Sequence, residues 1–294
     1  MNTYNNQTFP TTNDAATALA QPFLTGTSTN NYSYGLLTST IMQNRFGIDK
    51  LVWSNGGPDL GYVIDNSQPG GYQAGVDCSG FVARVLSAVY PNGNASLYDD
   101  IVIQNGQLQN YQTPQHPQPF PSAEDYANFF ARIANQQQGP WQTITCNAAI
   151  QGAEAVQYGS MNHAQPGDIL AYSLQPPSTD TGHVMVISSI QPLVQGQANT
   201  PYWPTDLTEF TSNGLQFYAV TVFDSSNVQH WNDSRQDKAT GVGKGTILIV
   251  ANAQGIPVAF QFNKNFVLLT VGNTNYATDL QIGQLQTLAI GRGG

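Results

Sequence analysis

The chain has 294 residues, which is long for one average domain and short for three. Its net charge is −9 and only 9% of its residues are charged, so nucleic acid is close to excluded as a partner and an anionic membrane surface is disfavoured. Apolar residues make up 40% of the chain, enough for a sizeable core, but no run of about 18 of them occurs that would span a membrane.

Residues 1–30 are polar and rich in Thr and Asn, and we interpret them as a loosely structured lead-in segment. One domain is expected over 31–294. Three stretches near 54–76, 104–122 and 192–214 are rich in Gly, Pro or Gln, which is typical of irregular surface segments. We therefore interpret these stretches as loops and insertions of the domain.

Hydrophobic spacing predicts three helices and then a run of strands. Helices are expected within 31–48, over 79–90 and over 122–137. Segments rich in Val, Ile and Phe predict strands at 168–173, 183–190, 215–223, 246–251, 258–262 and 266–271, with a closing strand near the C-terminus. Helices followed by antiparallel strands indicate the α+β class rather than alternating α/β.

The motif DCSGFV at 77–82 is the most informative local feature. A Gly-rich loop ends at Cys78 and an amphipathic helix begins at once, which puts the sulfur at a helix N-terminus. The backbone N–H groups there, together with the helix dipole, favour a thiolate and can form part of an oxyanion hole. The alternative is a buried structural cysteine, a common use of this residue.

Two further motifs favour the catalytic interpretation. The sequence PGDIL at 166–170 begins one predicted strand, and GHVMVI at 182–187 puts His183 at the first residue of the next. A thiol nucleophile needs a base within hydrogen-bond reach, and a histidine held by a strand can supply it. A histidine at a strand edge is more often structural when it occurs alone.

Together these motifs resemble the NlpC/P60 cysteine peptidases, papain-like enzymes that cut peptide bonds in bacterial cell-wall peptidoglycan. The resemblance covers roughly residues 31–290, and its strong parts are the three motifs. It implies a papain-like α+β fold, in which N-terminal helices pack on an antiparallel β-sheet. It also implies that Cys78 is the nucleophile and that His183 is the general base.

The family also has a polar residue that orients the imidazole from the next strand. That strand ends near Asp224, and if it pairs antiparallel with the histidine strand, Asp224 lies across from His183. A carboxylate there would fix the tautomer and stabilise the imidazolium. Asp224 is alternatively the start of a turn, and Asn227 or His230 is then the orienting residue.

The substrate groove is expected around the cysteine. We predict that Asp77 and Ser79, which flank it, contact substrate together with Tyr72, Tyr62 and Trp53. The chain departs from the family here, because the loop before the cysteine carries its aromatic and Gly-Gly elements at a different spacing. Each of these aromatic side chains can equally be a plain wall of the groove.

The remaining polar features carry weaker signals. Arg235 and Arg292 are scarce cations that would meet carboxylates of a peptide stem or, more commonly, pair with structural Asp residues. The glycine-rich 241–246 lacks the spacing of a phosphate-binding loop. The isolated histidines show no metal-ligand spacing, so neither a metal nor another cofactor is expected, and Cys146 is interpreted as a buried small residue.

The resemblance implies hydrolysis of amide bonds in peptidoglycan peptide stems, at a bond between D-glutamate and a diamino acid, through a thioester. Alternatives stay open: a delivered antibacterial amidase with an inhibitor or immunity protein as partner, a non-hydrolytic module that binds wall peptides, or an acyltransferase. We expect the protein in the cell envelope, periplasm or medium, although residues 1–6 show no basic or apolar region of a signal peptide.

Overall fold

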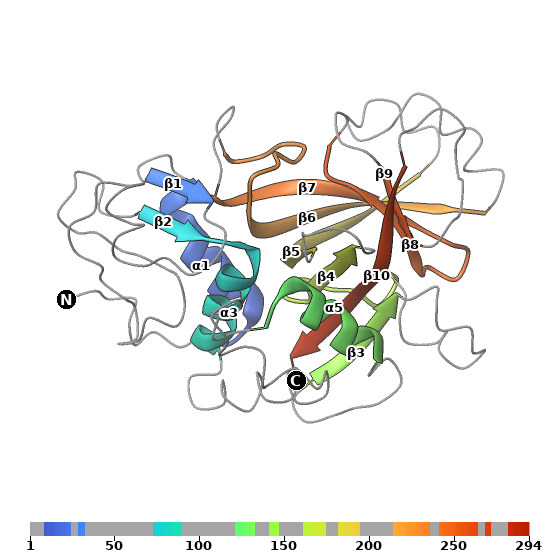
Figure 1. The fold of residues 1–294 in the computed structure, drawn as a ribbon, viewed down its shortest axis with the longest axis horizontal. Helices are drawn as coiled ribbons and strands as arrows, with labels where there is room; N and C mark the ends of the chain where they lie inside the picture. The colour runs from blue at the N-terminus through green and yellow to red at the C-terminus, as the bar shows by residue number, and fades with distance from the viewer. Residues whose placement is uncertain are drawn as a thin grey trace. The chain divides into compact units, whose positions relative to one another are not determined.

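A computed structural model of the chain describes residues 9–24, 29–32, 73–89, 121–132, 141–146, 161–174, 182–194, 214–235, 241–263, 268–271 and 282–293. The described elements mix helices with a mainly antiparallel sheet, and strands predominate (Figure 1). The α+β class predicted from the sequence is therefore confirmed. The papain-like arrangement of these elements stays a prediction.

The chain divides into two compact units. Unit 1 comprises 1–122, 223–229 and 234–244, and unit 2 comprises 123–222, 230–233 and 245–294. The expected division into a lead-in and one domain over 31–294 stays a prediction. The three predicted insertions fall mostly outside the described residues, but the last residues of the first one form a strand rather than a loop.

Helix α1 (Thr12–Leu24) corrects the expectation that the lead-in is loosely structured throughout. Its start is capped, because the Thr11 hydroxyl oxygen accepts the backbone N–H of Asp14 at 3.1 Å and the hydroxyl donates to the Asp14 carboxylate at 2.7 Å. Its buried apolar side chains are mostly alanines, namely Ala15, Ala16 and Ala20, together with Leu19. Small side chains give a weak hydrophobic signal, which explains why the sequence pattern did not reveal this helix.

Helix α3 (Cys78–Val89) confirms the helix predicted over 79–90. Its buried side chains are those expected on the apolar face, and α1 packs against it within unit 1 (Figure 1). The short strand β2 (Gln73–Val76) leads into α3 and pairs in parallel with β1 (Thr29–Tyr32). Most of the helix predicted within 31–48 lies outside the described residues.

Eight strands form the main sheet: β3 (Trp141–Cys146), β4 (Ile169–Leu174), β5 (His183–Leu193), β6 (Gln216–Ser226), β7 (Gly241–Ala251), β8 (Pro257–Gln261), β9 (Leu268–Val271) and β10 (Ile282–Gly293). Their order is β3-β10-β4-β5-β6-β7-β8-β9. The start of β10 also pairs in parallel with β9, so the strands from β4 to β10 form a nearly closed barrel. The strands predicted from the sequence are confirmed, with shifted ends.

Helix α5 (Ala123–Arg132) covers one face of the barrel in unit 2, against β4 and β10 (Figure 1). The predicted helix over 122–137 is thus confirmed as far as 132, and the rest lies outside the described residues. A Cβ atom at Gly291 of β10 would lie 2.0 Å from the Phe130 ring. Glycine at this position therefore lets the helix approach the sheet closely.

Aromatic rings lie on the face of the barrel strands that is turned away from α5. The rings of Tyr172 on β4 and Phe260 on β8 lie 4.6 Å apart between centroids. Because β4 and β8 are not neighbours in the sheet, these rings meet across the barrel interior. Side chains that contact them therefore point into the barrel.

Candidate functional site

The start of α3 in unit 1 is held by Asp77. Its carboxylate accepts the backbone N–H of Gly80 at 2.7 Å and the hydroxyl of Ser79 at 3.0 Å, and its carbonyl accepts the N–H of Phe81 at 3.1 Å. This is the geometry of an N-cap residue followed by the first helical turn. The pattern Asp-Cys-Ser-Gly in the sequence is therefore explained by the turn from β2 into the helix.

Asp77 and Ser79 are both buried and hydrogen-bonded to each other. Their side chains thus hold the helix start, and their contact with substrate stays a prediction. The predicted groove residues Tyr72, Tyr62 and Trp53 lie outside the described residues.

Cys78 is the first residue of α3, and its thiol takes part in no disulfide. The residue is 5% exposed, so most of the thiol is shielded from water. The first N–H groups of an α-helix have no acceptor within the helix, and they carry the positive end of its dipole. The sulfur therefore belongs to a turn whose backbone favours negative charge.

His183 begins β5 in unit 2, as the sequence predicts. It lies opposite Tyr172 in the β4–β5 register and is 6% exposed. The preceding Gly182 has φ of +119°, and a Cβ atom there would lie 1.9 Å from the carbonyl oxygen of Tyr172. Only glycine fits this position, which explains the Gly-His pair as the entry of the chain into the strand.

A second histidine and a phenylalanine accompany His183 in unit 2. The ring of Phe262, directly after β8, meets the His183 ring edge-on with 5.6 Å between centroids. The same ring stacks with His230 at 5.1 Å and an interplanar angle of 5°. Sequence reasoning named His230 as an alternative orienting residue but missed Phe262, because one phenylalanine at a strand end carries no distinguishing signal.

His230 reaches this place because β7 provides room for it. A Cβ atom at Gly245 would lie 2.6 Å from the Cβ of His230. The neighbouring Trp231 pairs with Thr246 through both backbone hydrogen bonds, of 3.0 and 2.7 Å. The glycine at position 245 of β7 thus lets His230 and Trp231 lie directly on this strand.

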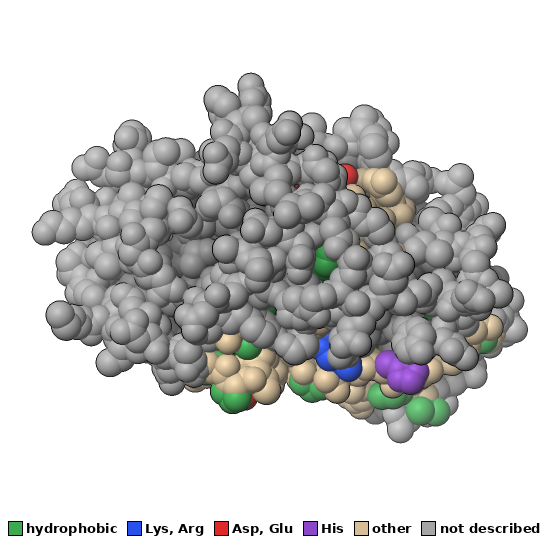
Figure 2. Space-filling model, turned by 90° about the horizontal axis from the view of Figure 1, so that it is seen from below, with side chains coloured by type: hydrophobic (Ala, Val, Ile, Leu, Met, Phe, Trp, Pro, Cys, Tyr) green, Lys and Arg blue, Asp and Glu red, His purple; other side chains and the backbone are tan. Residues whose placement is uncertain are grey.

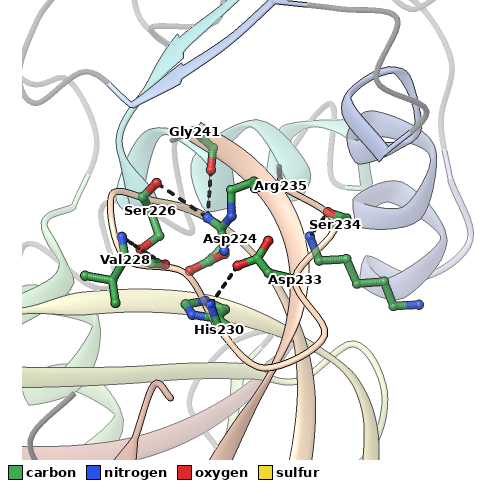
Figure 3. A network of polar contacts seen from close by, with 9 residues as sticks. Asp224, Ser226, Val228, His230, Asp233, Ser234, Arg235 and Gly241 are labelled. Carbon is green, nitrogen blue, oxygen red and sulfur yellow. Dashed lines mark hydrogen bonds and ion pairs between the residues drawn. The ribbon is translucent and has the colours of Figure 1, made fainter. Parts of the chain in front are cut away.

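Asp224 on β6 forms a buried ion pair in unit 1, which Figure 3 shows. Its carboxylate lies 3.1 Å from the guanidinium of Arg235, and both side chains are at most 1% exposed. The guanidinium also donates to the carbonyl oxygen of Gly241 at 2.9 Å. A Cβ atom at Gly243 would lie 2.7 Å from the Arg235 side chain, so this glycine too leaves room for the connection.

These contacts bear on the expected orienting residue. The pairing of Arg235 with an aspartate confirms the structural alternative for this cation. The contact of Asp224 with His183 stays a prediction. Of the two alternatives, Asn227 is exposed, whereas His230 is buried beside Phe262.

The PGDIL motif forms a turn and, through Asp168, an anchor, by which we mean the ion pair of this turn with Arg292 of β10. Pro166 and Gly167, with φ of +96°, form the centre of a turn in which Asp168 N–H donates to the Gln165 carbonyl at 3.1 Å. The Asp168 carboxylate accepts two hydrogen bonds from Arg292, of 2.7 and 2.9 Å. Burial raises the pKa of Asp168 above its ordinary value, while the hydrogen bonds from Arg292 lower it in part.

The glycine-rich 241–246 lies in strand β7, whereas a phosphate-binding loop needs an irregular turn before a helix. Within the described ranges, no three His, Cys, Asp or Glu side chains gather closely enough to hold a metal ion. None of the described helices is long and apolar enough to cross a membrane. The described side chains on the face in Figure 2 are mostly uncharged.

No family model, curated protein or solved structure matches the chain.

Proposed function

We propose that the protein is a cysteine peptidase that hydrolyses amide bonds in the peptide stems of bacterial peptidoglycan. The observation that carries the proposal is the position of Cys78 as the first residue of a helix capped by Asp77. A thiol there gains from the helix dipole, as an activated nucleophile requires. The resemblance of the three motifs to the NlpC/P60 peptidases supports the substrate class.

The proposed reaction has two steps. The Cys78 thiolate attacks the amide carbonyl carbon, the N–H groups at the start of α3 stabilise the oxyanion, and His183 protonates the departing amine as the C–N bond breaks. Water then attacks the resulting thioester, His183 takes its proton, and the C–S bond breaks to release the carboxylic acid and restore the thiolate. The net reaction consumes one water molecule for each amide bond.

The surroundings of the two side chains support these roles. The cap by Asp77 fixes the helix start and thereby the N–H groups that would face the oxyanion. Packing against Tyr172 and Phe262 fixes the His183 ring. Asp224 would orient His183 while its ion pair with Arg235 holds the carboxylate in place. The approach of the Cys78 sulfur to the His183 ring is part of the proposal.

The substrate bond and the location follow from the resemblance. The proposed bond joins D-glutamate to a diamino acid, and the enzyme would act in the cell envelope or outside the cell. A chain with net charge −9 does not gain from bulk attraction to an anionic wall. Recognition is therefore assigned to local contacts in the groove around Cys78.

Digestion of purified peptidoglycan, followed by mass spectrometry of the released stem peptides, tests the proposal. We expect the wild-type protein to release fragments that have gained one water, and Cys78→Ala and His183→Ala to lose about 10³-fold or more in rate. Matched controls are Cys146→Ala, which removes the other cysteine, and His163→Ala, which removes an exposed histidine in a turn. Both controls should keep the wild-type rate.

The same experiment separates the alternatives. If Cys78→Ala releases the same fragments, the cysteine mechanism is wrong. If neither form cleaves but both bind the wall, the protein is a binding module. Fragments that have gained an amine instead of water would identify an acyltransferase, because the thioester then passes to an amine.

A further inference from the structure

Phe262 is the residue that joins the two buried histidines of unit 2. Its ring meets His183 at an interplanar angle of 84° and His230 at an angle of 5°, with centroids 5.6 and 5.1 Å away. The two imidazoles therefore contact one phenyl ring in two different geometries. Edge-to-face and offset-stacked contacts are the two arrangements that aromatic rings prefer.

The Phe262 ring is itself held by the barrel interior. It meets Phe260 edge-on at 5.0 Å and Tyr172 at 6.3 Å, and it is 3% exposed. Because Tyr172 also contacts His183 at 6.2 Å, rings surround the catalytic candidate from β4 and from the end of β8. A change in the tilt of Phe262 would thus be passed to the His183 ring.

Phe262 has a close counterpart, Phe260, two residues earlier in the chain. Phe260 lies in β8 and Phe262 directly follows it, with Gln261 between them, and their two rings meet inside the barrel. The Phe260 ring lies 4.6 Å from that of Tyr172 and 5.0 Å from that of Phe262, and within the described part of the chain it contacts neither imidazole. The two phenylalanines are therefore alike in burial but different in their relation to the imidazoles.

We propose that Phe262 is a positioning residue, which sets the orientation of the His183 ring and keeps His230 stacked beside it. The proposal rests on the proposed function in one respect, since it takes His183 to be the general base. General-base catalysis needs the ring nitrogen within hydrogen-bond reach of the group it deprotonates. Small misplacement of such a group lowers the rate of the chemical step more than it lowers binding.

Kinetics on the wall peptide test this role with Phe262→Leu, Phe262→Tyr and the matched control Phe260→Leu. We expect Phe262→Leu to lower kcat about tenfold or more with KM within about twofold, because binding does not need the imidazole. Phe262→Tyr keeps the ring and should stay within about threefold of the wild type. Phe260→Leu removes a contact with Phe262 but none with an imidazole, so it should lower kcat less than Phe262→Leu once the rate is corrected for the folded fraction from thermal unfolding.

A second measurement does not depend on activity. In protein with ¹³C-labelled histidine, the ring current of Phe262 changes the chemical shifts of the carbon-bound ring protons of His183 and His230. Their NMR shifts should both move in Phe262→Leu and should move less in Phe260→Leu, which keeps the Phe262 ring, while His163 serves as an internal reference. A role in folding alone would give similar changes in the two leucine variants.

The two proposals fail in different ways. If the wild type cleaves and Phe262→Leu keeps kcat, or loses no more of it than Phe260→Leu, the positioning role is wrong and the proposed function survives. If the wild type cleaves nothing, the proposed function is wrong. The histidine shifts then decide whether Phe262 positions the two rings, and unchanged shifts in Phe262→Leu overturn this inference as well.

Discussion

The start of α3 and the end of the barrel that carries His183 are built by different forces. In unit 1, Asp77 holds Cys78 through hydrogen bonds between residues that are at most four positions apart. In unit 2, His183 is held by the rings of Tyr172 on β4 and of Phe262, which directly follows β8. One half of the proposed site is thus a local turn, and the other is a product of the whole barrel.

This difference has consequences for mutation. A capping hydrogen bond is kept by any side chain that offers an acceptor at the same place, so conservative changes are tolerated. Packed rings and glycine contacts depend on volume, and the surrounding interior cannot yield easily. The barrel end should therefore be the more sensitive region, and four changes test this comparison.

The largest effect is expected for Gly182→Ala at the barrel end. The added Cβ would overlap the carbonyl oxygen of Tyr172, and the backbone has a positive φ, so we expect a loss of about 4 kcal/mol in the free energy of unfolding. Chemical denaturation measures it. The control is Gly214→Ala, which also has a positive φ but whose Cβ would make only an ordinary contact, 3.8 Å from the Cβ of Ala253, and should lose only about 1 kcal/mol. Equal losses would refute the steric argument.

Arg235→Met should come next, because it leaves the Asp224 carboxylate buried without its cation. We expect a loss of about 3 kcal/mol in the free energy of unfolding. The double variant Asp224→Leu with Arg235→Met should recover a large part of this loss, since it buries no charge. If the loss in the double variant equals the sum of the losses in Arg235→Met and Asp224→Leu, the two side chains are not energetically coupled.

Arg292→Gln tests the anchor at the PGDIL turn and its dependence on pH. Burial raises the pKa of Asp168, so its charge costs stability at neutral pH, and that cost vanishes as the pH falls and the carboxyl takes up a proton. Removing Arg292 removes contacts that lower this pKa. The variant should therefore lose about 2 kcal/mol near pH 7 and less near pH 4. Denaturation curves at both values measure it, and a loss that grows on acidification would contradict the sign.

The smallest effect is expected at the start of α3. Asp77→Ala should lower the free energy of unfolding by about 1 kcal/mol, because the N–H of Gly80 loses its acceptor. Asp77→Asn keeps an acceptor and should change stability by only a few tenths of a kcal/mol. A larger loss for either variant than for Gly182→Ala would reverse the proposed order of sensitivity.

Local features of this fold could be predicted from the sequence. The apolar face of α3 and the Val- and Ile-rich β5 have strong periodic signals, and both begin within one residue of the predicted position. The role of Asp77 also has a local signal, since Asp directly before an apolar helix is a preferred N-cap.

Features that depend on distant residues could not be predicted. The sequence predicted a strand from 246, whereas β7 begins at Gly241, and the space beside Gly243 and Gly245 is occupied by Arg235 and His230. The role of Phe262 depends on strands that meet across the barrel. No spacing along the chain records such a contact.

The reaction of Cys78 with iodoacetamide tests most directly whether the two regions act together. At about pH 7, peptide mass spectrometry should show that Cys78 is alkylated about tenfold more slowly in His183→Ala than in the wild type, because only the thiolate reacts and the imidazole takes its proton. His163→Ala should match the wild type. Equal rates of Cys78 alkylation in the wild type and in His183→Ala would contradict the pairing of these two residues and with it the proposed function.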